Sequence, residues 1–126
     1  MTIERRIAGK ARDLVEGQKE AGAKHEKESA YRSLCESFPI LLRSAGLAQT
    51  VSYLRTKPKK GEYGALYDHL EEQFRNLGFL AAESLSEKAA DPRLSQADYR
   101  LYSEMVMHAA LWHKRMAQAL LRKKGD

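Results

Sequence analysis

The four histidines could support the widest range of chemistry in this chain, because imidazole can bind a metal ion or exchange a proton near neutral pH. They stand at positions 25, 69, 108 and 113, and none has the glutamate three residues before it that a di-metal site in a helical bundle needs. His108 and His113 are five residues apart, about 140° around a helix, whereas a zinc-binding pair is spaced by four. We therefore expect no metal and no cofactor, and we expect the histidines at the surface or its boundary.

Nucleophilic and phosphate-cradling chemistry is no better supported. Cys35 is the single cysteine, has no histidine near it in the sequence, and falls on or beside an apolar helical arc. It is therefore expected to be a small buried hydrophobe rather than a catalytic thiol. Neither a Gly-x-Gly-x-x-Gly pattern after a strand nor a Gly-x-x-x-x-Gly-Lys-Ser/Thr pattern occurs. The sequence predicts no catalytic residue, and the chain is not expected to be an enzyme.

Positive charge is the chemistry that remains, and it is unevenly distributed. The 126 residues carry 22 Lys+Arg and 17 Asp+Glu, a net charge of +5. Residues 62–91 hold seven acids and two bases, so this segment has a net charge of −5 and the rest of the chain has +10. An asymmetry of this kind makes nucleic acid the first partner to consider.

The basic side chains outside the acidic segment form three clusters. One recurs every seven residues near the N-terminus, one puts four bases into six residues before and after a proline, and one lies near the C-terminus. A solvated surface, with some cations stabilising a helix C-terminus, is the alternative explanation. No helix-turn-helix pattern is present, so contact with a phosphate backbone is expected rather than with base edges. The candidate nucleic-acid contacts are Arg5, Arg12, Lys19, Arg55, Lys57, Lys59, Lys60, Lys114, Arg115 and Arg122.

The elements that must position these residues are helices. Between the three prolines, at positions 39, 58 and 92, apolar residues recur every three or four positions, and no alternating strand pattern of useful length appears. We predict an all-α fold: a compact, single-domain bundle of about five to seven helices over residues 1–126, with a long C-terminal helix. The apolar arcs of the predicted helices cover residues 3–15, 30–45, 47–54, 66–77, 80–90 and 96–124.

Two details of these helices can be tested directly. Pro39 lies inside the second arc, where it should kink or restart the helix, with Ser37 as a possible cap. On the last helix, which begins after Ser95, Met107 and Leu111 fall on the charged side. They are either ordinary exposed apolar residues or a contact with another protein.

The composition also limits where the chain can reside. A hydrophobic fraction of 43% is too high for a disordered protein, and no apolar run approaches the ~20 residues of a membrane helix. One cysteine cannot form an internal disulfide. A soluble cytoplasmic protein without a membrane partner is the expectation.

Two stretches carry a family resemblance. The first is Phe38 to Leu54, FPILLRSAGLAQTVSYL, in which an apolar-proline-apolar run leads through a Gly-Leu corner into a helix containing Gln49. The second runs from Tyr99-Arg100 through Glu104 to WHKRMAQA at residues 112–119. Both resemble the small, all-helical subunit of type III-B CRISPR effector (Cmr) complexes, although position 113 is more often apolar in that family.

The resemblance implies a non-catalytic subunit of a ribonucleoprotein. Such subunits stack in several copies along a filament, against the repeated backbone subunits and the polymerase-like large subunit, and help to hold the duplex of guide RNA and target RNA. RNA cleavage belongs to the backbone subunits. The expected partners are therefore guide RNA, target RNA, those two kinds of subunit and further copies of the chain. Arg43 joins the candidate RNA contacts because it lies in a matching motif and a basic context, and Met107 and Leu111 become candidate protein contacts.

A second class of function stays open on the sequence alone. A helical regulator associated with DNA, or a protein-interaction adaptor unrelated to CRISPR, would show the same helical periodicity and the same excess of bases.

Overall fold

The computed structural model describes residues 2–19, 25–56 and 61–125, and these ranges hold six helices. The prediction of an all-α fold with a long C-terminal helix is confirmed. The helices are α1 (Ile3–Gly17), α2 (His25–Ala45), α3 (Leu47–Thr56), α4 (Glu62–Asn76), α5 (Leu85–Ala89) and α6 (Gln96–Leu120).

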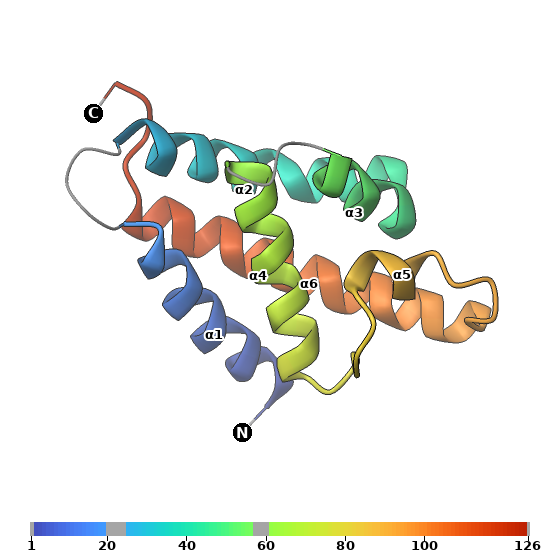
Figure 1. The fold of residues 1–126 in the computed structure, drawn as a ribbon. Coiled ribbons are helices and arrows are strands. Elements are labelled where there is room, and N and C mark those ends of the chain that lie inside the picture. The colour runs from blue at the N-terminus through green and yellow to red at the C-terminus, as the bar shows by residue number, and fades with distance from the viewer. Residues whose placement is uncertain (1, 20–24, 57–60, 126) are drawn as a thin grey trace.

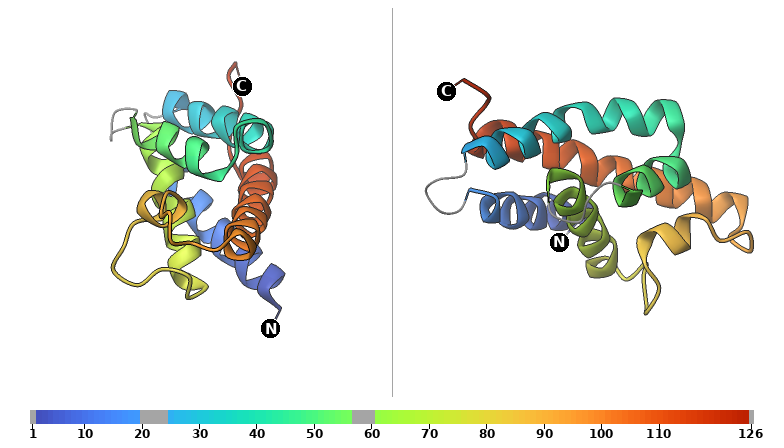
Figure 2. Two further views of the ribbon diagram at one scale, coloured as in Figure 1. Left: turned by 90° about the vertical axis from the view of Figure 1, so that its right-hand side faces the viewer. Right: turned by 45° about the horizontal axis from the view of Figure 1, so that its top comes forward.

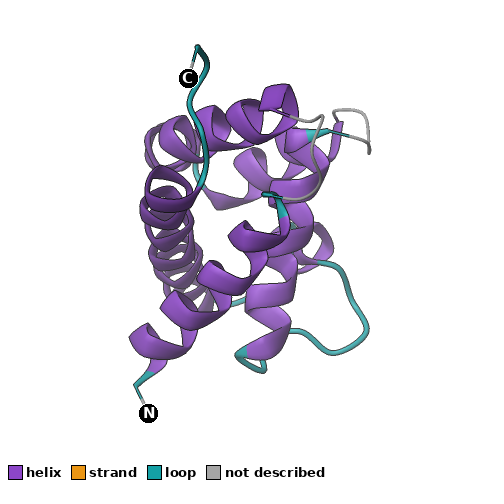
Figure 3. Cartoon of the chain, turned by 90° about the vertical axis from the view of Figure 1, so that its left-hand side faces the viewer, coloured by secondary structure: helices purple, strands orange, loops and turns teal. Residues whose placement is uncertain are grey.

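Helix α6 is the centre of the arrangement. It packs along α1 on one side and α2 on the other, while α4 crosses these helices on one face (Figure 1). Helices α3 and α5 pack against each other and against α4. The left view of Figure 2 shows α1 and α6 on one side of the molecule with α4 and α5 on the other. Loops join the helices, and the ranges given above contain no strand (Figure 3).

One hydrophobic cluster connects these layers. It takes side chains from all six helices, among them Ile7, Phe38, Leu54, Phe74 and Val106. Such continuity supports the prediction of a single domain over residues 1–126, which stays a prediction. Within the described residues, no helix is long and apolar enough to cross a membrane.

Helix α2 differs from the prediction at Pro39. It continues through the proline as one helix of 21 residues, so of the two expected outcomes, a kink or a restart, the restart is wrong. Ser37 donates to the Leu34 carbonyl instead of capping a new helix. Pro39 removes one backbone donor from the ladder, but the residue itself is buried. Burial of the apolar arc on both sides of Pro39 therefore outweighs the lost hydrogen bond.

The predicted helix over residues 80–90 is shorter than expected. Only Leu85–Ala89 is helical. Ser84 caps this turn by accepting from the Glu87 backbone, while the Glu87 carboxylate accepts from the Ser84 backbone. This capping box fixes the start of α5 at Leu85 and leaves residues 77–84 as a connection.

Helix α6 begins as predicted but ends four residues early. Ser95 accepts from the Asp98 N–H at 3.0 Å and caps its first turn. At the other end, Leu121 is extended and buried, and two groups of α2 hold the backbone there. The Glu28 carboxylate accepts from the Arg122 N–H at 2.6 Å, and Arg32 donates to the Leu121 carbonyl at 2.9 Å. These bonds to α2 replace the last predicted turn of α6.

Glycine at position 46 is required by the corner between α2 and α3. Gly46 has φ of 85°, and a Cβ there would lie 3.8 Å from the Tyr99 hydroxyl, which also accepts from the Ala48 N–H. Gly46→Ala is expected to destabilise the protein by about 1–2 kcal/mol, because the left-handed region is unfavourable for alanine. Gly9→Ala in α1, where nothing lies within 4 Å, should instead stabilise it by about 0.5–1 kcal/mol.

Urea unfolding followed by circular dichroism measures both changes. Two shifts of the same sign would show that backbone conformation does not control these positions.

Candidate nucleic-acid interface

Three of the predicted cations form one strip on α1. Arg5, Arg12 and Lys19 are exposed, and among the residues that the structure describes none of the three forms an ion pair. Glu16 is the acid closest to the same strip, four residues after Arg12. The strip, defined here as Arg5, Arg12 and Lys19, therefore carries a net positive charge at the surface.

The α1 strip is turned away from α4. Lys10 marks the α4 side of α1, because its ammonium group lies 2.7 Å from the Glu72 carboxylate. At about 100° per residue, the three strip residues lie roughly 180–220° around the helix from Lys10. The acidic segment 62–91 forms α4, the connection to α5, and α5 itself. The α1 cations and this segment thus face opposite sides of the molecule.

Arg115 adds a fourth cation near the strip. Its guanidinium carbon lies 5.2 Å from the centre of the Trp112 ring, and Trp112 is half-buried against the core. The Gln73 side chain shows which residues of α1 and α6 lie side by side. Its Nε2 lies 2.9 Å from the Ile7 carbonyl of α1 and 3.2 Å from His113 Nε2 of α6. Trp112 and Arg115 are therefore within one turn of the height at which α1 passes α6.

Lys114, Met107 and Leu111 lie on a different side of α6. Gln118 marks the α2 side, because it donates to the Glu36 carboxylate at 3.0 Å. The three residues fall within about 40° of Gln118 around the helix. All three are half-buried, and Met107 packs against the core. Met107 and Leu111 are thus partly accessible rather than fully exposed, and their role as a contact with another protein stays a prediction.

Of the four bases around Pro58, the structure describes one, Arg55. Arg55 is exposed, but its guanidinium lies 3.1 Å from the Ser86 hydroxyl and 5.1 Å from the centre of the Tyr67 ring. It connects α3 to α4 and α5, which a phosphate contact would have to disrupt. Lys57, Lys59 and Lys60 lie outside the described residues, so their role stays a prediction.

The two remaining predicted cations lie far from each other. Arg43 is exposed in the last turn of α2, and Arg122 is exposed beyond α6, where it meets the first turns of α2. A helix of 21 residues is about 30 Å long, so the length of α2 separates them. The structure thus places Arg5, Arg12 and Lys19 on one strip of α1 and Arg115 on the neighbouring helix α6, and it leaves Arg43, Arg55, Lys114 and Arg122 elsewhere.

Two histidines expected at the surface or its boundary belong to a buried polar network. The Tyr31 hydroxyl lies 2.6 Å from His69 Nδ1 and 3.2 Å from His113 Nδ1. His113 is 0% exposed, and Gln73 reaches its other nitrogen. One assignment of protons satisfies these contacts: Gln73 donates to His113 Nε2, His113 Nδ1–H donates to Tyr31, and Tyr31 donates to His69. The network joins α2, α4 and α6.

Burial controls the protonation of this network. It lowers the pKa of His69 to about 4 and that of His113 to about 3, so both rings are neutral at pH 7. It also raises the pKa of Cys35 to about 12, so the thiol stays protonated, as expected for a buried hydrophobe. Within the described part of the chain, no three His, Cys, Asp or Glu residues are grouped so as to hold a metal ion.

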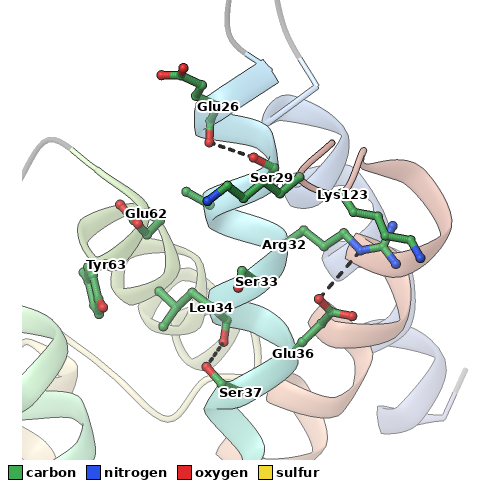
Figure 4. A pocket seen from close by; sticks show the side chains of 12 residues that line it. Glu26, Ser29, Arg32, Ser33, Leu34, Glu36, Ser37, Glu62, Tyr63 and Lys123 are labelled. Carbon is green, nitrogen blue, oxygen red and sulfur yellow. Dashed lines mark hydrogen bonds and ion pairs between the residues drawn. The ribbon is translucent and has the colours of Figure 1, made fainter. Parts of the chain in front are cut away.

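A groove of about 700 Å³ along α2 is the other candidate site (Figure 4). Three acids and three bases line it, so it has no net charge that would select a ligand. Ser29 and Ser37 donate to carbonyls of their own helix, and Arg32 is held by Leu121 and Glu36. The charged residues of the lining are Glu26, Arg32, Glu36, Glu62, Lys123 and Lys124.

Comparison with known proteins decides the family. The model of the CRISPR-associated protein family Cmr5 matches residues 3–120. The chain belongs to the Cmr5 family. The Cmr subunit Cmr5 of the CRISPR system of Thermus thermophilus is 34% identical over 101 residues, which are 80% of this chain and 83% of that protein. The resemblance carried by the two sequence stretches is therefore confirmed.

The fold agrees with this Cmr5 assignment. The crystal structure of a CRISPR-associated Cmr5 family protein, also from Thermus thermophilus, matches with a TM-score of 0.77 at 28% identity. The match covers 97% of this chain and 99% of that one, so the six helices of the present Cmr5 protein follow a fold already observed in the family.

Proposed function

We propose that this Cmr5 protein is a non-catalytic small subunit of an RNA-guided type III-B CRISPR (Cmr) effector complex. Its partners in this proposal are the backbone and polymerase-like large subunits, further copies of itself, and the duplex of guide RNA and target RNA in the cytoplasm. Family membership over residues 3–120 is the observation that carries the proposal. The groups best suited to catalysis support a non-catalytic role, because His113 and Cys35 are buried and held in their uncharged forms.

The α1 strip and Arg115 form the proposed RNA surface. The three cations of the strip face away from the acidic helix α4, the exposed Arg115 lies on the neighbouring helix α6, and Glu16 is the nearest acid on the described part of α1. Cations in such an array neutralise phosphates and release counterions, whatever the sequence of the RNA. Recognition of sequence is then left to base pairing between guide and target.

Binding of single-stranded RNA tests this surface. The variant Arg5→Gln with Arg12→Gln should bind a labelled RNA more weakly and flatten the slope of log K against log salt by about 1.4, which is about 0.7 for each of the two phosphates no longer neutralised. Glu16→Gln should strengthen binding, because it removes the negative charge from the strip. Fluorescence anisotropy over a series of salt concentrations measures both effects.

A matched pair of cations on the acidic side gives the control. Lys88→Gln with Arg93→Gln removes the same charge from exposed or half-exposed positions within or just beyond the segment 62–91. Equal losses in the two double variants would show that only net charge matters and would contradict the proposed surface. A strong preference for one duplex DNA site, or failure of the tagged chain to co-purify with Cmr subunits from its host, would contradict the proposed function itself.

A further inference from the structure

The single tryptophan of the chain lies beside the proposed RNA surface. Trp112 is half-buried on α6, about 120° around the helix from Gln118, which marks the α2 side. Helix α1 packs along the side of α6 opposite α2 (Figure 1). From the angle to Gln118 we infer that Trp112 is turned toward α1. Arg115 is exposed, and its guanidinium stands 5.2 Å from the ring centre. An aromatic ring and a planar cation thus lie together at the junction of α1 and α6.

Along the axis of α1, cations of the α1 strip lie both before and after this junction. Gln73 contacts both the Ile7 carbonyl and His113, so position 7 of α1 is level with position 113 of α6. Arg5 lies two residues before that level and Arg12 five residues after it, which are about 3 and 7.5 Å along the axis of α1. Trp112 and Arg115 lie one residue before and two residues after the same level. Cations for phosphate contact are therefore available on both sides of the aromatic ring.

This combination matches the chemistry of unpaired nucleotides. Bases of single-stranded RNA stack on aromatic side chains and on arginine planes, while the adjacent phosphates are held by basic residues. A base inside a duplex is already stacked and offers the protein mainly its backbone. The basic strip by itself serves either form of RNA, but a half-exposed indole with a guanidinium beside it adds affinity for an unpaired base.

We propose that Trp112 and Arg115 form a subsite that stacks one unpaired nucleobase of RNA, with the flanking phosphates on Arg5 and Arg12. This inference rests on the proposed function, since it assigns one contact within the same surface. The subsite gives the protein a preference among RNA ligands in addition to neutralising phosphate charge. The preferred ligand is a nucleotide displaced from a duplex or one at the end of a duplex.

Trp112 itself reports on the subsite, because no other tryptophan contributes to the emission. Titration with a single-stranded RNA oligomer should quench the Trp112 fluorescence along the same curve that anisotropy gives for binding of a labelled RNA. An oligomer of equal length with abasic ribose should bind about 5- to 150-fold more weakly, the range for losing one stacked base, and should leave the emission almost unchanged. Free N-acetyltryptophanamide corrects for absorption of light by the RNA.

Four variants separate the loss of stacking from a loss of stability. Arg115→Ala should weaken binding of the single strand more than binding of the abasic oligomer, and it leaves the tryptophan in place. Trp112→Leu should remove the difference between the two oligomers, whereas Trp112→Phe should keep most of it. Leu101→Ala, which shortens an exposed apolar side chain on the same helix, should behave as the unaltered protein. Thermal unfolding followed by circular dichroism confirms that each variant is folded.

The possible outcomes distinguish this subsite from the surface around it. RNA that binds by anisotropy without changing the tryptophan emission, with equal affinity for the abasic oligomer, would overturn the stacking subsite and leave the proposed function intact. Absence of binding to every oligomer would overturn both.

Discussion

Acidification from pH 6.5 to pH 3 is expected to cost this protein roughly 7 kcal/mol of stability through His69 and His113 alone. Both rings have a pKa near 6.5 in the unfolded chain, and burial lowers the pKa to about 4 and about 3 in the folded protein. Above pH 6.5 the rings are neutral in both states, so stability does not depend on them. Below pH 6.5 the unfolded chain binds protons first, and stability falls until the folded rings also bind them.

The hydrogen bonds of the network explain why protonation is unfavourable in the folded state. A proton on His113 Nε2 would face the Gln73 amide, which already donates in that direction, and a proton on His69 Nδ1 would face the donating Tyr31 hydroxyl. The charge of Glu72 opposes the fall in the pKa of His69, but its effect is smaller than that of burial. The network therefore accommodates neutral rings only.

Urea unfolding between pH 7 and pH 4 measures this dependence. Carboxylates also contribute to acid unfolding, so the comparison is between variants. His69→Gln should lose stability at pH 7 but should show a shallower decline below pH 6.5 than the unaltered protein. His108→Gln, at an exposed position five residues before His113, should show the unaltered decline. An identical decline in His69→Gln would show that the buried rings do not control acid stability.

This network also shows how far the sequence alone can predict the structure. The spacing of the histidines excludes a metal pair, but it does not say which of them are buried. The expectation of a position at the surface or its boundary is wrong for His113, whereas the half-buried His69 agrees with it. Position 113 lies between Ala109 and Ala117 on the wheel of the last helix, so the apolar arc is the signal that could have placed His113 in the core. Its partners could not be predicted, because Tyr31 and Gln73 come from helices whose packing depends on the whole fold.

The candidate RNA surface was also predictable only in part from the sequence. Seven-residue spacing is sufficient to place Arg5, Arg12 and Lys19 on one strip, since that inference needs only one helix. Which side of the molecule the strip faces follows from how α1 packs, as the Lys10–Glu72 ion pair shows, and the partial burial of Met107 follows from its packing against the core. Contacts between helices are long-range in the sequence, and periodicity carries no information about them.

Phe38→Ala is expected to be the most destabilising single substitution among those considered, at about 3–5 kcal/mol. The Phe38 ring is 1% exposed in the cluster that joins all six helices, so its removal leaves a cavity that the neighbouring helices cannot close without moving. Ile40, on the other side of Pro39 in the same helix, is 68% exposed, and Ile40→Ala should change stability by no more than about 0.5 kcal/mol.

The comparison of these two substitutions tests why α2 continues through its proline. If the buried arc holds the helix together across Pro39, loss of Phe38 should lower the urea midpoint sharply, whereas loss of Ile40 should leave it unchanged. Both side chains are large and apolar and stand next to the same proline, so helix propensity alone cannot separate them. Similar midpoints for the two variants would contradict the explanation and would mean that the helix is held at Pro39 by local backbone preference rather than by the core.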